Sequence, residues 1–361
     1  MKKTTLYNTH LELNAKMTSF GGFEMPIQYS GVKKEHLTVR NNLGVFDVSH
    51  MGEFYVSGPN ALPLLQYICS NDISKISVGK AQYNYFPNET GGIVDDLIIY
   101  RTEESSYLLV VNASNILKDW KWIQKHNTSF NAKIEDRSEI TALLAIQGPK
   151  ALEAMQKLTS SRLDELPYYA HTQGTFAGCE NTLIATTGYT GAGGIEIYFP
   201  SEKAPLVWGA VLEAGESFGI APIGLAARDT LRTEMGYCLY GNEINDTSSP
   251  IAAGLKWISK PEKGCISATQ ISSEISNGTA KKLIGFLMES RAIPRSGHTL
   301  VDKENKIIGQ VSSGTQSPTL AKGIGMGYVD TDFAKPRTEI GVQIRGKNCP
   351  AKVVKLPFIE S

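Results

Sequence analysis

Hydrophobic positions recur along this chain at two spacings, one typical of helices and one typical of strands, so we expect a mixed fold. Apolar side chains three or four positions apart predict helices, and two of these begin just after Gly58-Pro59 and Gly148-Pro149. Asn112 or Ser114 could cap another of the predicted helices. The apolar sets span Leu62 to Cys69, Ile116 to Ile123, Leu152 to Leu158, Leu206 to Ala214, and Leu225 to Met235.

Paired β-runs with glycine-rich turns between them predict two hairpins. One pair is 83–86 with 93–100, and the other is 182–187 with 194–199. Because the predicted helices do not alternate with single strands, a doubly wound parallel sheet is not expected. The fold class that we expect is α+β.

The last part of the chain has the pattern of a separate β domain. Residues 272–282 are rich in Ser, Asn, Gly and Lys, which predicts a linker. The β-runs that follow are short and separated by turns, which favours a small barrel of about 80 residues. These runs are 283–288, 307–311, 325–329 and 342–344.

Composition narrows the possible classes of protein. The 361 residues are enough for two or three domains. Lys plus Arg equals Asp plus Glu at 36 each, and this balance does not favour nucleic acid as a partner. No stretch approaches the about 18 apolar residues of a membrane span, so no membrane association is expected. The first residues resemble neither a secretory signal nor a mitochondrial presequence, which favours the cytoplasm.

Metal and nucleotide sites are not indicated by the motifs. The five cysteines are widely spaced without CxxC pairs, which favours free thiols, and the six histidines form no HExxH pair. The glycine-rich segments 187–194 and 323–327 lack the P-loop and GxGxxG spacings. We therefore expect turns or bulges there and no bound metal.

Two adjacent carboxylates, Asp95 and Asp96, lie inside the predicted strand 93–100. Side chains alternate along a strand, so the two should point to opposite faces, and one of them should share its face with apolar neighbours. Burying an unpaired carboxylate is costly, so such placements are rarely accidental. The alternative interpretation is a pair of turn-proximal acids at the edge of a sheet.

A third carboxylate, Glu196, shares a strand face with Tyr198. A carboxylate can accept two parallel hydrogen bonds from an amidine-like edge, such as the 2-amino and ring N–H groups of a pterin. The alternative interpretation is a solvated strand face.

Arg228 and Arg232 lie four positions apart, so they share one face of the predicted helix. Solvated ion pairs with Asp229 and Glu234 are the ordinary explanation for such arginines. The alternative is that one arginine binds a substrate carboxylate through two hydrogen bonds.

Several longer motifs occur along the chain in a characteristic order. They are GFEMP at 22–26, FDVSHMGE at 46–53, GGIVDDLI at 91–98, GYTG at 188–191, LAARDTLR at 225–232 and LYGNEI at 239–244. In these motifs the chain resembles the glycine cleavage T-protein family over almost its whole length, and their shared order and spacing are more specific than any one of them.

The resemblance implies a three-domain cloverleaf arrangement around a central folate cleft, with a small C-terminal β-barrel domain. The implied first folate-binding domain is discontinuous, as is the second α+β domain. The implied boundaries are 1–53 with 137–240, 54–136 with 241–275, and 276–361 for the barrel.

The resemblance also implies an aminomethyltransferase that moves a methylene carbon from the aminomethyl-lipoyl H protein to tetrahydrofolate. Ammonia would be released and 5,10-methylenetetrahydrofolate formed, with the lipoylated H protein as the partner. Asp96 matches the family's carboxylate near the folate N10, and Glu196 matches the residue that grips the pterin edge. The other matched folate-binding positions are Met51, Tyr83, Asn112, Tyr189 and Arg228.

The sequence departs from the family pattern in two places. Many relatives extend past the last strand with a residue that reaches the folate, whereas this sequence finishes with residues 357–361. Residues 263–267, KGCIS, partly resemble a motif of folate-binding proteins that assist iron–sulfur assembly, so an accessory role without turnover is the alternative. The missing Tyr-x-Gly-Gln continuation argues against that role. A folate module of the sarcosine dehydrogenase type would normally accompany a flavin domain, and no flavin fingerprint is present.

Overall fold

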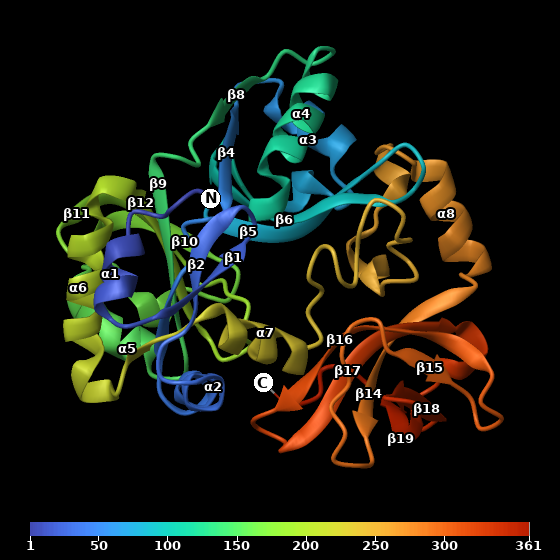
Figure 1. Ribbon diagram of the computed structural model, residues 1–361. Coiled ribbons are helices and arrows are strands. Elements are labelled where there is room, and N and C mark those ends of the chain that lie inside the picture. The colour runs from blue at the N-terminus through green and yellow to red at the C-terminus, as the bar shows by residue number, and fades with distance from the viewer. Residues whose placement is uncertain (361) are drawn as a thin grey trace. The chain divides into compact units, whose positions relative to one another are not determined.

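The computed structural model describes residues 1–360, which form two compact units (Figure 1). Both units are discontinuous in sequence, and the finer division into three domains stays a prediction. Ser361, the last residue of the terminal segment considered above, lies outside the described residues. The first unit combines Met1–Asn84 with Asp96–Arg228, and the second combines Tyr85–Asp95 with the chain from Asp229 onward.

The first unit contains a six-stranded sheet in which one neighbouring pair is parallel and the others are antiparallel. Its strands are β3 (Gly44–Asp47), β9 (Thr141–Gln147), β10 (His171–Phe176), β11 (Cys179–Ala185), β12 (Gly194–Pro200) and β13 (Ala221–Pro222). Their order is β10-β11-β12-β9-β3-β13. Ala185 lies opposite Glu196 in the β11–β12 pair, which confirms the second predicted hairpin.

Two helices contribute to the core of this sheet, α5 (Ala151–Met155) and α6 (Ala204–Gly215). Met155, Trp208 and Val211 belong to the same buried cluster as strand residues such as Ile146 and Ile197. The apolar spacing had predicted both helices. Helix α5 is shorter than expected, because the 3-10 turn at Gln156–Leu158 takes over from Gln156.

A five-stranded sheet has the order β5-β6-β7-β4-β8. Its strands are β4 (Gly52–Ser57), β5 (Lys80–Pro87), β6 (Ile93–Glu103), β7 (Ser106–Val111) and β8 (Lys133–Asp136). The turn at 88–92 joins β5 and β6, with the Asn88 N–H donating to the Gly92 carbonyl at 2.9 Å, as the first predicted hairpin requires. Strand β6 has neighbours on both sides, so the edge-strand interpretation of Asp95 and Asp96 is wrong.

Helices α3 (Ala61–Ile68) and α4 (Ile116–Asn127) confirm two more predicted helices. The expected cap is wrong: α4 is preceded by a 3-10 turn at Ala113–Asn115, and Asn115 takes the N-cap position without a side-chain capping bond. The amide of Asn112 bonds to Asp96 instead.

The N-terminal part of the first unit adds a small antiparallel pair and short helices. These elements are α1 (Tyr7–Glu12), β1 (Lys16–Phe20), β2 (Phe23–Gln28) and α2 (Val32–Asn41). Helix α7 (Leu225–Glu234), which the spacing had predicted, begins in the first unit and ends in the second.

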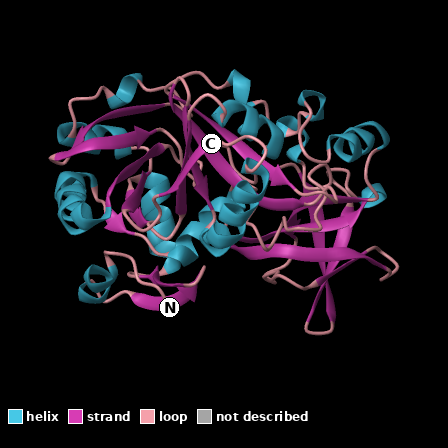
Figure 2. Cartoon of the chain, turned by 90° about the horizontal axis from the view of Figure 1, so that it is seen from above, coloured by secondary structure: helices cyan, strands magenta, loops and turns pink. Residues whose placement is uncertain are grey.

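The second unit carries a closed six-stranded barrel, as the β-run pattern predicted (Figure 2). Its strands are β14 (Lys281–Met288), β15 (Thr299–Val301), β16 (Ile307–Ser317), β17 (Lys322–Asp330), β18 (Glu339–Ile344) and β19 (Lys347–Val354). Their order is β14-β17-β16-β15-β18-β19. Strands β15 and β19 were not predicted. The turn or bulge expected at 323–327 is wrong, because this glycine run lies inside β17. A Cβ on Gly325 would come within 2.4 Å of the Phe286 ring.

The linker predicted at 272–282 is wrong, because helix α8 (Ala268–Asn277) covers most of it. Ile271 is buried and Ile275 lies one turn further along, so the helix has a narrow apolar side that its many serines obscure. Gly278, at φ +79°, ends the helix just before β14.

The described residues include no helix long and apolar enough to cross a membrane. The five cysteines are free thiols, and four of them are buried.

Candidate functional site

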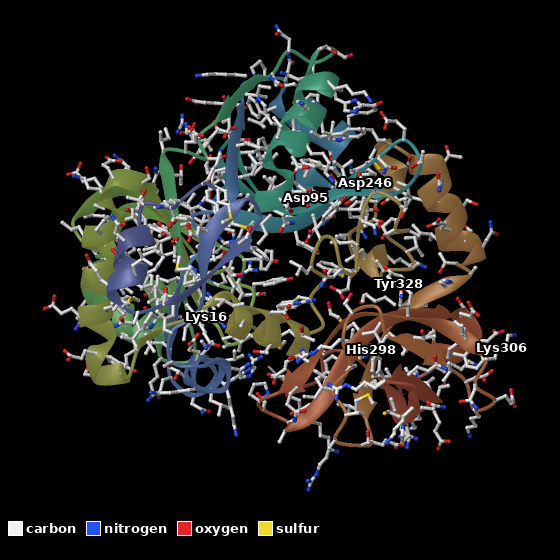
Figure 3. All side chains as sticks on the ribbon, viewed as in Figure 1. Lys16, Asp95, Asp246, His298, Lys306 and Tyr328 are labelled. Atoms are coloured by element: carbon white, nitrogen blue, oxygen red, sulfur yellow. The ribbon has the colours of Figure 1, made fainter. Side chains whose placement is uncertain are left out.

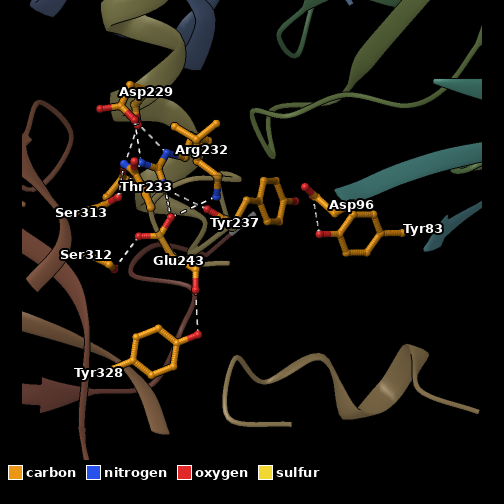
Figure 4. Close-up of polar contacts among 12 residues, drawn as sticks. Tyr83, Asp96, Asp229, Arg232, Thr233, Tyr237, Glu243, Ser312, Ser313 and Tyr328 are labelled. Atoms are coloured by element: carbon orange, nitrogen blue, oxygen red, sulfur yellow. Dashed lines mark hydrogen bonds and ion pairs between the residues drawn. The ribbon is translucent and has the colours of Figure 1, made fainter. Parts of the chain in front are cut away.

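Asp96 is held from two sides within the first unit. The Tyr83 hydroxyl donates to Asp96 Oδ2 at 2.7 Å (Figure 4). The Asn112 amide donates to Asp96 Oδ1 at 2.9 Å. Asn112 also donates to the Asp96 carbonyl at 3.1 Å. The carboxylate is half-buried, whereas Asp95, labelled in Figure 3, is fully buried. The predicted alternation of the two acids is therefore confirmed.

Strand register explains why these side chains meet. Val111 lies opposite Leu97 on one side and Gly52 on the other, so the next row of the sheet holds Asp96 and Asn112. Met51, which directly precedes β4, falls in the same row and is half-buried. Residues distant in sequence thus come together at one end of the sheet.

Glu196 belongs to a polar cluster rather than to a solvated strand face, so that alternative interpretation is wrong. The Thr187 hydroxyl donates to Glu196 Oε2 at 2.5 Å, and the Tyr100 hydroxyl lies 3.5 Å from the same oxygen. Tyr100 is also within 2.7 Å of Thr187 Oγ1 and 2.9 Å of the Tyr198 hydroxyl. Burial raises the pKa of Glu196, although the bond from Thr187 and the charge of Arg228 act in the opposite direction.

Arg228 stacks on Tyr189, with its guanidinium carbon 4.5 Å from the ring centroid. The start of α7 is fixed by the buried carboxylate of Glu35, which accepts from the N–H of Gly224 at 2.8 Å. A Cβ on Gly224 would come within 2.3 Å of the Ile27 carbonyl oxygen, so this close approach requires glycine. The helix therefore presents Arg228 one turn later.

The glycine loop at 187–194 positions Tyr189. Gln147 is buried, donates to the Thr187 carbonyl at 3.1 Å and accepts from Thr190 Oγ1 at 2.9 Å. A Cβ on Gly188 would come within 1.9 Å of the Gln147 side chain. The loop is thus a packed turn, as expected.

Arg232 has a different environment from Arg228, although both lie on α7. Arg232 is 1% exposed and pairs with Asp229 at 2.7 Å and with Glu243 at 2.8 Å in the second unit (Figure 4). Glu234 accepts from Ser317 and Thr319. Arg232 therefore pairs with Asp229 as expected, but its guanidinium is buried and not solvated.

His50, next to Met51, is a buried neutral group. Among the described residues, neither ring nitrogen has a hydrogen-bond partner, and the ring packs edgewise against Phe20 at 5.5 Å between centroids. The pKa of His50 is lowered to about 4, mainly by burial and also by the charge of Arg228, while Asp47 opposes this shift.

Sequence reasoning placed Tyr198 on the Glu196 face but missed Thr187 and Tyr100 as parts of the Glu196 cluster. The alternation that separates Asp95 from Asp96 also places Tyr100 on the Asp96 side of β6, four positions along. That signal was present in the sequence, whereas the pairing of Tyr100 with β12 depends on the tertiary fold.

The first unit contains two half-buried acids, Asp96 and Glu196, and the Arg228 guanidinium stacked on the Tyr189 ring. Acids of this kind can accept hydrogen bonds from amines, and the Arg–Tyr stack suits a planar ligand. Among residues 1–360, no group of three or more His, Cys, Asp or Glu side chains could hold a metal ion.

The chain is similar to known proteins along almost its whole length. The model of the GCVT N-terminal domain matches residues 6–263, and the model of the glycine cleavage T-protein C-terminal barrel domain matches residues 281–360. Curated proteins named aminomethyltransferase are similar along 99% of both chains. They include one from Flavobacterium psychrophilum, 54% identical over 358 residues, and one from Bacteroides thetaiotaomicron, 55% identical over 360 residues.

A solved structure shows the same fold. The crystal structure of glycine cleavage system aminomethyltransferase T from Bartonella henselae is 34% identical and has a TM-score of 0.93. The match covers 99% of this chain and 98% of that one. The mixed α+β fold with its C-terminal barrel is thus that of an aminomethyltransferase enzyme. The chain belongs to the glycine cleavage T-protein family, and its activity is the aminomethyltransferase step of the glycine cleavage system.

Proposed function

We propose that the protein transfers the methylene carbon of an aminomethyl-lipoyl group, carried by the H protein, to tetrahydrofolate. The products are ammonia, the dihydrolipoyl H protein and 5,10-methylenetetrahydrofolate. The observation that carries the proposal is the geometry of Asp96, a reachable carboxylate whose two oxygens are oriented by Tyr83 and Asn112.

In the proposed reaction, the C–N bond of the aminomethyl group breaks and ammonia leaves with the bond electrons. The folate N5 then bonds to the methylene carbon, which is still attached to the lipoyl sulfur. As the C–S bond breaks, the sulfur takes the electron pair and a proton, leaving an N5 iminium ion. Closure through N10 forms the second C–N bond and releases the N10 proton.

Asp96 suits the charged steps of this reaction. A fixed carboxylate stabilises an adjacent iminium charge without reorganising, and it can accept the N10 proton. The Tyr83 and Asn112 hydrogen bonds restrict its rotation, so its orientation does not have to be established during the reaction. Water must be kept away, because it would convert the same intermediate to formaldehyde.

Glu196, Arg228 and Tyr189 would hold the pterin. As a carboxylate, Glu196 can accept from the 2-amino and ring N–H groups, and the ligand's donors would offset the burial that raises its pKa. Met51 is the proposed apolar contact.

The direct test is incubation with the aminomethylated H protein and tetrahydrofolate, measuring ammonia and 5,10-methylenetetrahydrofolate. We expect both products in equal amounts and neither when tetrahydrofolate is omitted at short times. Folate binding without product would contradict the proposed reaction. The unaminomethylated H protein is the matched control.

The proposal extends to compartment and domain boundaries. Free thiols are the state favoured by a reducing cytoplasm, where we place the activity. We also propose the division 1–53 with 137–240, 54–136 with 241–275, and 276–361. The barrel strands between Lys281 and Val354 support the last of these boundaries.

The accessory role is not favoured by the Lys263–Ser267 segment. Burial raises the pKa of the Cys265 thiol, which makes the thiolate scarce.

A further inference from the structure

Glu53 is a fully buried acid in the first unit, on β4. Its backbone is fixed, because its N–H donates to Ser138 Oγ at 3.0 Å and its carbonyl accepts from the Arg137 N–H at 2.9 Å. Its side chain is 0% exposed, and within residues 1–360 neither carboxyl oxygen has a hydrogen-bond partner. A buried polar group without a partner is unfavourable, so it calls for an explanation.

Register places Glu53 on the same sheet face as Asp96. Glu53 lies opposite Val110, and Val110 lies opposite Ile98, so these three share one row and one face. Two residues further along β6 and β7, the same face carries Asp96 and Asn112. Along this face, Glu53 is therefore two residues from the row of Asp96, the acid proposed to lie near the folate N10.

The same face also meets the cluster around Glu196. Burial raises the pKa of the Tyr198 hydroxyl well above its usual value, and the charges of Tyr100, Glu196 and Glu53 add to this effect. Tyr100, which shares the Asp96 side of β6, lies 2.9 Å from the Tyr198 hydroxyl and 3.5 Å from Glu196 Oε2, so this face of the sheet meets the proposed pterin-binding residues. The other charged group that acts on Glu53 is the exposed Asp136.

We propose that Glu53 is a further substrate-binding residue, whose carboxyl group hydrogen-bonds the polar edge of the heterocycle held by Glu196. This inference rests on the proposed function, since the heterocycle is the reduced pterin.

Glu53 and Glu196 would bind different polar atoms of the ligand. Burial, and then Asp136, raise the pKa of Glu53 well above its usual value, which favours the protonated carboxylic acid. A carboxylic acid donates one hydrogen bond as well as accepting others, whereas a carboxylate only accepts. Glu53 can therefore satisfy the carbonyl oxygen of a lactam, which the ionised Glu196 cannot.

The test compares Glu53→Gln, which keeps a neutral donor and acceptor, with Glu53→Met, which keeps only the volume. Calorimetric titration with tetrahydrofolate under anaerobic conditions should show Glu53→Gln within about three-fold of the wild type and Glu53→Met weakened by roughly ten- to one-hundred-fold. Glu135→Gln, the same change at a half-buried acid on β8, is the control and should bind normally. A melting curve of each variant shows whether it folds.

A second readout does not depend on the Met variant. The infrared carbonyl band of a protonated carboxyl group should shift when tetrahydrofolate binds, and Glu53→Gln should lack that band. An unshifted band, or full affinity in a folded Glu53→Met variant, overturns the inference. Wild-type protein that binds no tetrahydrofolate would instead overturn the proposed function, so the two failures can be told apart.

Discussion

Asp96 and Glu243 are both carboxylates fixed by hydrogen bonds, and the difference between them is access. Asp96 is half-buried and receives bonds from Tyr83 and Asn112. Glu243 is 0% exposed and receives bonds from Arg232 at 2.8 Å, the Leu239 N–H at 3.0 Å and Ser312 at 2.6 Å. The first arrangement leaves an oriented acid within reach of a ligand, whereas the second fastens a helix to a loop and the barrel in its own unit.

The largest expected effect in this comparison is on turnover at the accessible acid. Asp96→Asn keeps the size and a hydrogen-bonding capacity but removes the charge and the proton acceptor. We expect turnover to fall by about 10²- to 10⁴-fold, with tetrahydrofolate affinity changed only a few-fold. The measurement is ammonia release at saturating substrates together with a tetrahydrofolate titration.

The matched control for this variant is Asp164→Asn, the same change at an exposed acid paired with Arg162. Its turnover should equal that of the wild type. If the Asp96→Asn variant also showed wild-type turnover, the accessible Asp96 would not differ in function from the enclosed Glu243.

Breaking the enclosed pair should reduce stability rather than chemistry. Arg232→Met leaves Glu243 buried without its charged partner, which should lower the free energy of unfolding by about 3–5 kcal/mol. Urea unfolding measures the change. Lys303→Met breaks an exposed pair with Glu339 in the same unit and should leave the free energy of unfolding nearly unchanged. Equal losses in the two variants would refute the role of burial.

A buried acid whose hydrogen bonds all come from the protein tests, within the first unit, whether such partners and not the unit make an acid structural. Asp47 is 2% exposed and accepts from Thr4 at 2.7 Å, while His10 Nε2 lies 2.9 Å away. Burial alone would raise the pKa of Asp47, but the bonds from His10, Ser49 and Thr4 outweigh burial and lower it. Asp47→Asn should therefore cost about 1–3 kcal/mol of stability.

The pH dependence of that loss has a definite sign. Because the pKa of Asp47 is lowered on folding, its contribution is complete above the unfolded value of about 3.9 and is lost as the pH falls through the folded pKa. The stability difference between the wild type and Asp47→Asn should thus shrink in acid. A difference that grew as the pH fell would contradict this account.

Much of this architecture was visible in the sequence because local patterns were strong. The β6 run with its two aspartates, the turn at 88–92 and the short barrel strands all follow from spacing and turn residues. Helix α8 was not predicted because only Ile271 and Ile275 mark its apolar side among many polar residues. Strand β15 has three residues, too few for any alternation to be recognised.

The candidate site was only partly predictable for a different reason. Asp96 and Glu196 stood out because charged groups interrupt apolar strands, and the remaining positions came from the family resemblance. Thr187, which bonds to Glu196, follows strand β11 and has no local signal of its own. Its importance depends on the pairing of β11 with β12, which brings the end of one strand beside the start of the other.

A change at Thr187 gives the smallest predicted effect, and it tests directly the ionisation of Glu196 in the proposed pterin site. Its hydroxyl lowers the pKa of Glu196 against the effect of burial, so Thr187→Val should raise that pKa. Binding through Glu196 needs the ionised form and is lost as the pH falls through its pKa. The acid limb of tetrahydrofolate binding should therefore move to higher pH, with a loss of about ten-fold or less near neutrality. Thr187→Ser keeps the hydroxyl and should restore the profile, whereas identical profiles for Thr187→Val and the wild type would show that this hydrogen bond does not set the ionisation of Glu196.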